Sequence, residues 1–153
     1  MKKSLSERGF TLIELLVVIG ILTVLLSITL IAINPNRQFA QANNTKRQSD
    51  VVAILNAVGQ YMSENNGSLP SAITSVQQEI QSPGFADFCE TLVPQYLAAF
   101  PVDPQINNGV QIESNDCLNE WDSGYTIQQI SSNNRITVTA PLAQNNESIS
   151  VSR

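Results

Sequence analysis

The sequence contains no histidine, and this absence removes most of the chemistry by which enzymes move protons or bind zinc. Histidine titrates near neutral pH, and the serine and cysteine triads depend on it as their base. The seven glycines are scattered, and none of them belongs to a glycine-rich loop that could hold phosphate. The composition therefore argues against an enzyme, and no cofactor is expected.

Charge is also scarce, since Asp, Glu, Lys and Arg make up 14% of the 153 residues. Lys2, Lys3 and Arg8 lie within the first nine positions, together with Glu7. The rest of the chain has five basic and twelve acidic residues, which gives it a net charge of −7. Because no basic patch is available to neutralise phosphates, direct nucleic-acid binding is not expected.

The longest uniform feature is an apolar run of 24 residues from Phe10 to Ile33, in which only Glu14 is charged. A helix of this length would be roughly 36 Å long, enough to cross the ~30 Å hydrocarbon layer of a membrane. It is apolar on all sides, which suits lipid or a bundle of identical helices. The basic residues before it favour a cytoplasmic N-terminus and export of everything after Ile33. A carboxylate in such a helix is costly, so Glu14 requires a partner.

Two simpler interpretations compete for this run. An ordinary secretory signal has an apolar region of about 7–15 residues followed closely by a cleavage site of small residues. The run is longer than that, and Ala40-Gln41-Ala42 lies well beyond its end. The second alternative is a plain uncleaved anchor helix, in which Gly9 and Phe10 have no special role and Glu14 reaches the membrane surface.

The order of residues at the start of the run resembles the leader of type IV prepilins and type II secretion pseudopilins. The segment from Lys2 to Glu14 has a short basic leader, then Gly9-Phe10-Thr11-Leu12-Ile13-Glu14, then apolar residues. In that family a prepilin peptidase cuts after the glycine and methylates the new N-terminal phenylalanine. The resemblance implies cleavage between Gly9 and Phe10, N-methylation of Phe10, and an assembly role for Glu14.

The resemblance also implies an organisation and a set of partners. Residues 1–9 would be the leader, 10–33 the transmembrane and filament-core helix, and 34–153 an exported domain that includes the second half of the helix. Before assembly the subunit would be a single-pass membrane protein in contact with lipid. It would then polymerise with copies of itself through a membrane assembly platform, giving a filament at the cell surface or in the periplasm.

Beyond Ile33 the chain is predicted to continue as an amphipathic helix to about Asn65, with a kink near Pro35. Apolar residues recur three and four positions apart on one face: Val51, Ile54, Leu55, Val58, Tyr61 and Met62. Polar and charged residues occupy the other positions, among them Lys46, Arg47 and Asp50. Gly67 is suited to a left-handed helix cap.

Alternating residues near the C-terminus predict β-structure. Tyr125–Ile130 and Arg135–Ala140 are separated by four turn-forming residues, which indicates a hairpin. Ile149 and Val151 would form a last strand. The predicted fold class is therefore α+β, with a long N-terminal helix, apolar and then amphipathic, packed against a small C-terminal antiparallel sheet.

The segment between helix and sheet gives weaker signals. Residues 71–84 are polar, and Val76 and Ile80, four positions apart, predict a short helix there. The aromatic and apolar residues of Phe85–Phe100 predict a turn of helix and a loop that buries them.

An acidic cluster precedes the hairpin and consists of Glu113, Asp116, Glu120 and Asp122. Oxygen ligands that lie close together can hold calcium, and major pseudopilins carry a calcium site in a C-terminal loop. The order of residues here does not reproduce that site. A solvated acidic loop is therefore favoured, with a calcium site at Asp116, Glu120 and Asp122 as the alternative.

The two cysteines, Cys89 and Cys117, both follow the apolar run, and in an oxidising compartment they predict one disulfide. This pair and the missing calcium pattern favour a subunit of a type IV pilus-like filament. The alternative within the family is a pseudopilin of a type II secretion or DNA-uptake system. An alternative of another class is a membrane-tethered module that binds a ligand through the loops of residues 85–122.

Overall fold

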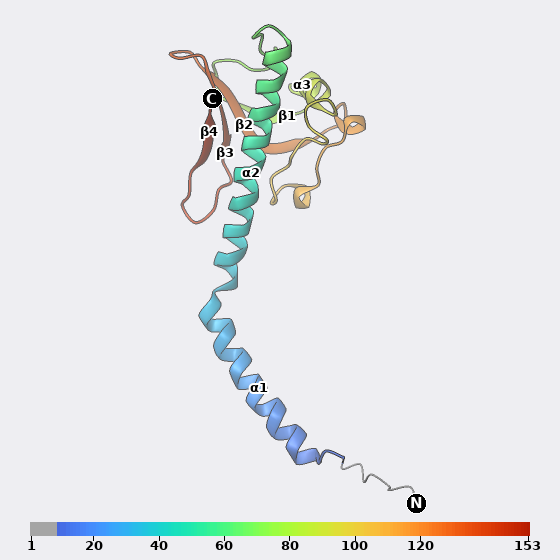
Figure 1. The fold of residues 1–153 in the computed structure, drawn as a ribbon, viewed down its shortest axis with the longest axis vertical. Coiled ribbons are helices and arrows are strands. Elements are labelled where there is room, and N and C mark those ends of the chain that lie inside the picture. Colours follow the sequence, from blue (N-terminus) through green and yellow to red (C-terminus); the bar gives the residue numbers. More distant parts are fainter. Residues whose placement is uncertain (1–8) are drawn as a thin grey trace, which may run out of the picture. The chain divides into compact units, whose positions relative to one another are not determined.

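The computed structural model describes residues 9–153, apart from the side chains of residues 32 and 33. The predicted leader therefore lies, except for Gly9, outside the described residues. The chain divides into two units, residues 1–38 and residues 39–153, and we call the second unit the head domain. The elements in Figure 1 are α1 (Leu12–Ile33), α2 (Pro35–Glu64), β1 (Gln78–Gln81), α3 (Ala86–Leu92), β2 (Asp122–Ile130), β3 (Arg135–Ala140) and β4 (Ile149–Ser152).

The long helix is interrupted at Asn34, where the sequence predicted only a kink. α1 ends at Ile33, Asn34 has φ 46° and ψ 76°, and α2 begins at Pro35. The residue before a proline is sterically disfavoured in the right-handed helical region, and asparagine tolerates the left-handed region better than most residues. Proline suits the first position of α2 because its missing N–H would have no partner there. The predicted kink near Pro35 is therefore present as a one-residue break at Asn34, which divides the long helix into two.

α2 contributes one apolar face to the core of the head domain, as the sequence predicted. The central members of the predicted stripe are at most 2% exposed: Val51, Ile54, Leu55 and Val58. Tyr61 and Met62 lie partly buried at the edge of the same core. The helix ends at Glu64, and Gly67 closes the turn after it, with φ 82° and its N–H donating to the carbonyl of Met62 at 2.8 Å. The predicted stop signal is confirmed.

The core is completed by a four-stranded antiparallel sheet in the order β1-β2-β3-β4, which lies behind α2 in Figure 1. β2 and β3 form the predicted hairpin, in which Ile130 is paired with Arg135 and the N–H of Asn134 donates to Ile130 O at 2.8 Å. Ile127 lies opposite Val138, and both are at most 1% exposed. β4 confirms the predicted last strand.

β1 takes the place of the short helix predicted within residues 71–84. Of its four residues only Ile80 is buried, between exposed neighbours, and Val76 is 66% exposed. The two residues therefore share no helical face, and the spacing of four was coincidental. β1 is paired with β2 along the sheet, and this pairing supplies backbone partners that a short polar helix would lack.

The aromatic segment after β1 is buried as predicted. α3 carries Phe88 and Leu92 into the core, and Phe100 follows them after a loop. The ring of Phe88 meets those of Phe85 and Phe100 edge-on, with centroid distances of 5.4 and 5.9 Å. On the same helix, Cys89 forms a disulfide with Cys117, and this bond joins α3 to the loop that precedes β2.

Replacing both cysteines by serine is expected to lower the free energy of unfolding by about 3–4 kcal/mol, because the disulfide restricts the unfolded chain. The bond joins residues 28 positions apart in the sequence. Denaturant titration of the full-length chain in detergent measures the difference. The exposed Ser114 lies in the same loop, so Ser114→Ala is a control that should change nothing. An unchanged midpoint for the double cysteine variant would contradict the expectation.

A buried polar network, which the sequence did not predict, joins α2 to two loops. Arg47 is fully buried, and its Nε and Nη2 donate to Asp103 Oδ2 and Oδ1 at 2.6 and 2.9 Å. Its Nη1 donates to Asn44 Oδ1 at 2.9 Å. Asn44 in turn binds the backbone of Gln144, donating to its carbonyl at 2.8 Å and accepting from its N–H at 2.9 Å. The network therefore positions the loop around Asp103 and the β3–β4 loop against α2.

The network continues one turn along α2 at Asp50, which is 7% exposed. Its carboxylate accepts from the hydroxyl of Tyr125 on β2 at 2.7 Å and from Lys46 Nζ at 2.9 Å. Burial, and then the neighbouring carboxylate, raise the pKa of Tyr125 above its ordinary value. Tyr125 is thus a neutral donor that connects the sheet to the charged side of α2.

Candidate processing and assembly site

The Gly9–Phe10 bond lies outside the helix, in a stretch without regular structure. Phe10 is 88% exposed, and a Cβ added to Gly9 would meet no atom within 4 Å. Peptidases cut exposed backbone that carries small residues and is free of helical hydrogen bonds. The bond that the sequence predicted as the cleavage site therefore has the accessibility that cleavage requires.

Thr11 and Glu14 form a reciprocal cap at the start of α1. The backbone N–H and the hydroxyl of Thr11 donate to Glu14 Oε2 at 2.8 and 2.7 Å, and the N–H of Glu14 donates to the Thr11 hydroxyl at 3.3 Å. This is the capping box of an N-cap threonine and a glutamate three residues later. The sequence analysis missed this role for Thr11, although the pattern Thr-Leu-Ile-Glu contains its signature.

The cap leaves part of the Glu14 carboxylate available. Both hydrogen bonds from Thr11 end on Oε2, and within residues 9–153 no donor contacts the other oxygen. A carboxylate can accept several hydrogen bonds, so the cap and an additional cationic partner are compatible. Glu14 has a local role in beginning the helix and retains capacity for a second one.

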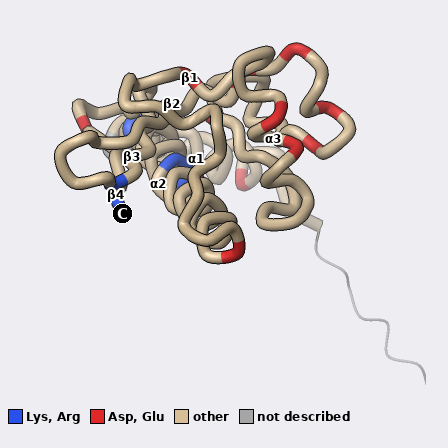
Figure 2. Tube along the Cα trace, turned by 90° about the horizontal axis from the view of Figure 1, so that it is seen from above, with Lys and Arg blue, Asp and Glu red and all other residues tan. Residues whose placement is uncertain are grey.

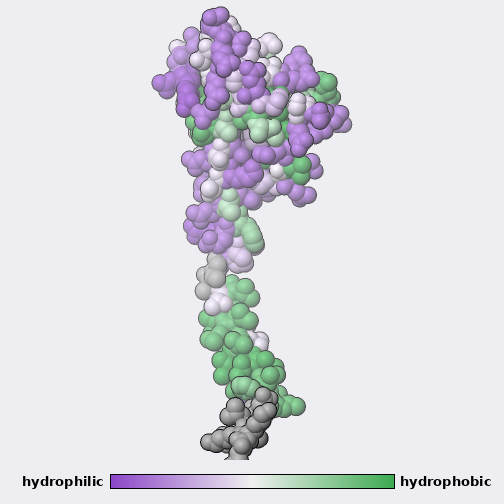
Figure 3. Space-filling model, turned by 45° about the vertical axis from the view of Figure 1, so that its right-hand side comes forward, coloured by the Kyte–Doolittle hydropathy of each residue, from purple (hydrophilic) through white to green (hydrophobic). Residues whose placement is uncertain are grey.

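The remainder of α1 presents almost nothing but hydrocarbon. Within the described part of the chain it is the one helix long and apolar enough to cross a membrane, and none of its span from Leu12 to Ile31 is buried. Figure 3 shows hydrophobic colour over α1 and a largely hydrophilic head domain. The hydroxyls of Thr23, Ser27 and Thr29 donate to carbonyls three or four residues earlier, at 2.7–2.9 Å. These side chains therefore satisfy their hydrogen bonds within the helix itself.

The acidic residues suggested as calcium ligands are not gathered into a metal site. No group of three or more His, Cys, Asp or Glu within residues 9–153 is placed to hold a metal ion. The Asp116 carboxylate instead accepts from the Asn119 amide at 3.1 Å, and Asp122 accepts from the N–H of Gly124 at 2.8 Å. Glu120 is exposed. The carboxylates of Asp116 and Asp122 therefore make hydrogen bonds within their own loop.

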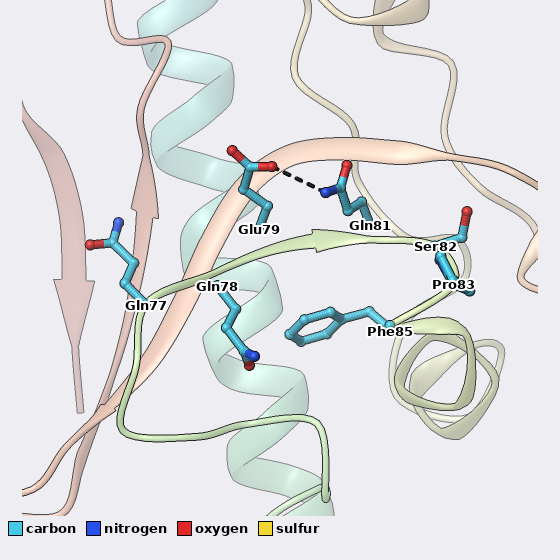
Figure 4. Close-up of a pocket in the computed structure, with 8 residues that line it drawn as sticks. Gln77, Gln78, Glu79, Gln81, Ser82, Pro83 and Phe85 are labelled. Atoms are coloured by element: carbon cyan, nitrogen blue, oxygen red, sulfur yellow. Dashed lines mark hydrogen bonds between the residues drawn. The ribbon is translucent and has the colours of Figure 1, made fainter.

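A hollow of about 490 Å³ lies along β1 and the turn after it (Figure 4). One continuous segment, residues 77–85, supplies its lining. Figure 4 shows Glu79 and Gln81 on one side of the strand, joined by a hydrogen bond of 3.1 Å, and Gln78 on the other. Glu79 is the one ionisable side chain in this lining, so the hollow assembles no acid–base pair.

Comparison with known proteins agrees with this geometry. Residues 5–30 match the family model described as the prokaryotic N-terminal methylation motif. The type II secretion system core protein G of Klebsiella michiganensis is 33% identical over 101 residues, which cover 65% of this chain and 68% of that protein. The chain belongs to the family of type II secretion core protein G. The Escherichia coli protein of the same name is 29% identical over 113 residues, covering 73% of this chain and 76% of that protein. No solved structure matches.

Membership of this pseudopilin family confirms the predicted resemblance, and the α+β arrangement of helix and antiparallel sheet confirms the predicted fold class. The chain is a pilin-like structural subunit or pseudopilin. Its single apolar helix and its family relationship fit a membrane-anchored protein with an exported C-terminal domain.

Proposed function

We propose that this chain is a pseudopilin that is cut between Gly9 and Phe10 and polymerises through α1 into the filament of a secretion system. The single observation that carries the proposal is the relationship to core protein G, which extends over most of the chain and beyond the N-terminal motif. The accessible Gly9–Phe10 bond before a capped apolar helix supports the processing step. The other participants are a prepilin peptidase that also methylates Phe10 and a membrane assembly platform.

The proposed topology places the N-terminus in the cytoplasm and the head domain outside the membrane. The basic residues Lys2, Lys3 and Arg8 favour this orientation. The Cys89–Cys117 disulfide suits the oxidising side. The filament then occupies the periplasm or reaches the cell surface, and lipid surrounds α1 until assembly.

A type IV pilus subunit is the second candidate, and the disulfide favours it, because the C-terminal regions of type IV pilins are often closed by one. Deleting the chain from its own organism distinguishes the two candidates. Loss of protein release into the medium, with surface pili intact, supports the secretion role. Loss of pili with normal release supports the pilus role. An unprocessed N-terminus without filaments would instead indicate a tethered binding module.

Processing is tested by intact-mass measurement of the membrane-bound protein. The mature chain is expected to begin at Phe10 and to carry one methyl group on its amine. A bulky residue at Gly9, as in Gly9→Leu, should leave the precursor uncut, because the added side chain occupies the position that the peptidase must approach. Gly20→Leu is the matched control within α1 and should be cut normally. A mature chain that begins at Met1 or Asn43 would refute the proposal.

A further inference from the structure

Leu118 is an exposed apolar side chain held on a rigid turn of the head domain. It is 70% exposed, the highest fraction among the large apolar side chains of residues 39–153. The turn is fixed on both sides, since Cys117 is in the disulfide and its carbonyl accepts from Trp121 Nε1 at 2.8 Å. The N–H of Asn119 also donates to the carbonyl of Asp116 at 2.9 Å. The turn therefore presents Leu118 to solvent. Because the backbone is already ordered, binding there would cost little conformational entropy.

A hollow of matching character lies between α2 and the end of the sheet. It has a volume of about 210 Å³ and is lined mainly by apolar surface from Leu55, Gly59, Met62, Asn134, Ile136 and Arg153. Gly59 leaves part of this space open, because a Cβ placed there would meet no atom within 4 Å. The space accommodates one aliphatic side chain.

The two features carry opposite charges. Asp116 and Glu120, both exposed, lie two residues before and after Leu118. At the hollow, Arg153 Nη1 donates to Asn56 Oδ1 on α2 at 2.7 Å, which holds the guanidinium at the rim. Figure 2 shows most acidic residues on the side of α3 and the loops after it, and basic residues at the ends of β3 and β4. Such complementarity orients partners and fixes their register.

We propose that Leu118 of one subunit inserts into this hollow on the next copy of the same chain, with Asp116 and Glu120 facing the neighbour's Arg153. The inference rests on the filament function proposed above and assigns a contact between head domains, in addition to the packing of α1. The loops between α3 and β2, which include Leu118, and the strand β3, which supplies Ile136 to the hollow, lie on opposite sides of α2 (Figure 1). This contact joins two different surfaces of the same protein. A row of subunits joined in this way has an unoccupied Leu118 at one end and an unoccupied hollow at the other, so further copies can be added at either end.

The first test changes the apolar contact in the full-length chain and measures the ratio of filamentous to membrane-bound subunit in cells. Leu118→Ser should lower this ratio about tenfold or more, because one buried leucine is lost from each contact. Val76→Ser is the matched control, since Val76 is 66% exposed and lines neither the hollow nor the turn of Leu118, and it should assemble normally. Normal filament yield from Leu118→Ser would overturn the proposal.

The hollow is tested by Gly59→Leu, which places an aliphatic side chain in the space, where a Cβ would meet no atom within 4 Å. Leucine also favours the helix more than glycine does, so the unfolding midpoint should stay the same or rise. Filaments should nevertheless decrease about tenfold. A variant that is stable but cannot assemble cannot be explained by misfolding. Filaments at wild-type yield together with lost protein release would show that another partner occupies the hollow, and would overturn the proposal.

The charges are tested by exchanging them. Glu120→Arg and Arg153→Glu should each lower the filament ratio, and the double variant should recover much of it, because opposite charges again meet. No recovery would overturn the assigned pairing. Failure of the filament function itself has a different signature, namely no filaments and an uncut N-terminus in the wild-type chain.

Discussion

Glu14→Leu is expected to insert into the membrane at least as well as the wild-type chain and to assemble more than about a hundredfold less. Insertion should improve because the variant removes a carboxylate that costs on the order of 3 kcal/mol within the bilayer. Assembly should fail because the amine that cleavage creates on Phe10 would lose its counter-charge. In a low-dielectric setting, removing one member of a buried ion pair destabilises the contact by about 3–5 kcal/mol.

The geometry allows this carboxylate to act between subunits. Phe10 directly precedes the N-cap Thr11, whose backbone N–H donates to the Glu14 carboxylate at 2.8 Å, so the carboxylate lies near the start of the mature chain. The capping bonds from Thr11 occupy one carboxylate oxygen, and no donor within residues 9–153 contacts the other. We propose that, as apolar helices slide past each other, the meeting of an incoming amine with this oxygen sets the axial register. The measurement is the ratio of filamentous to membrane-bound subunit in cells that express only the variant.

Two further variants separate docking from capping. Glu14→Gln preserves the capping box, since glutamine serves equally at that position, but it removes the charge. It should fail to assemble as Glu14→Leu does. Thr11→Val removes the cap and keeps the carboxylate, which should loosen the helix start by about 1 kcal/mol and leave filaments intact. If Glu14→Gln forms filaments normally while Thr11→Val does not, Glu14 acts as a cap and not as the docking group.

Arg47→Met is expected to lower the free energy of unfolding of the head domain by about 3–5 kcal/mol. Both side chains of the Arg47–Asp103 pair are fully buried, so the variant leaves the Asp103 carboxylate without its counter-charge. Arg47 also donates a hydrogen bond to Asn44. Asn44 in turn binds Gln144 in the β3–β4 loop, so the variant also weakens the attachment of that loop. Denaturant unfolding monitored by the fluorescence of Trp121 gives the difference.

The control for this variant is the neighbouring cation. Lys46 binds Asp50 at 2.9 Å, but its side chain is 38% exposed, so Lys46→Ala should cost no more than about 1 kcal/mol. Replacing both members of the buried pair, as Arg47→Met with Asp103→Leu, should recover much of the stability lost by Arg47→Met alone. Equal losses for the single and double variants would show that the charge left behind is not the cause.

The sequence predicted those parts of the fold that are encoded locally. The stripe from Val51 to Met62, the hairpin turn and the helix stop at Gly67 each depend on residues within a few positions of one another. The Arg47–Asp103 pair could not be predicted, because its members are 56 residues apart and the burial of arginine depends on what the fold places over it. β1 was missed for a similar reason, since its pairing with β2 outweighs the preferences of a short polar segment.

The residues of the candidate site were easier to predict from the sequence than the Arg47–Asp103 pair or β1. Gly9, Phe10 and Glu14 belong to one dense N-terminal pattern, and their positions followed from it directly. The contact proposed for Leu118 shows the opposite case. Nothing in the sequence distinguishes an exposed leucine from a buried one, and the hollow at Gly59 exists only because α2 and β3 lie side by side in the fold.

The inward hydrogen bonds of Thr23, Ser27 and Thr29 have a consequence for turnover of the filament. These hydroxyls need no external partner. The helix α1 can therefore move from lipid into contact with other helices, and back again, without exposing an unpaired hydroxyl at these three positions. In the proposed filament, a subunit withdrawn from the base would therefore return to lipid with these three hydroxyls paired as they were before assembly. The membrane would then act as a common reservoir, from which the same molecules can be drawn for successive rounds of extension.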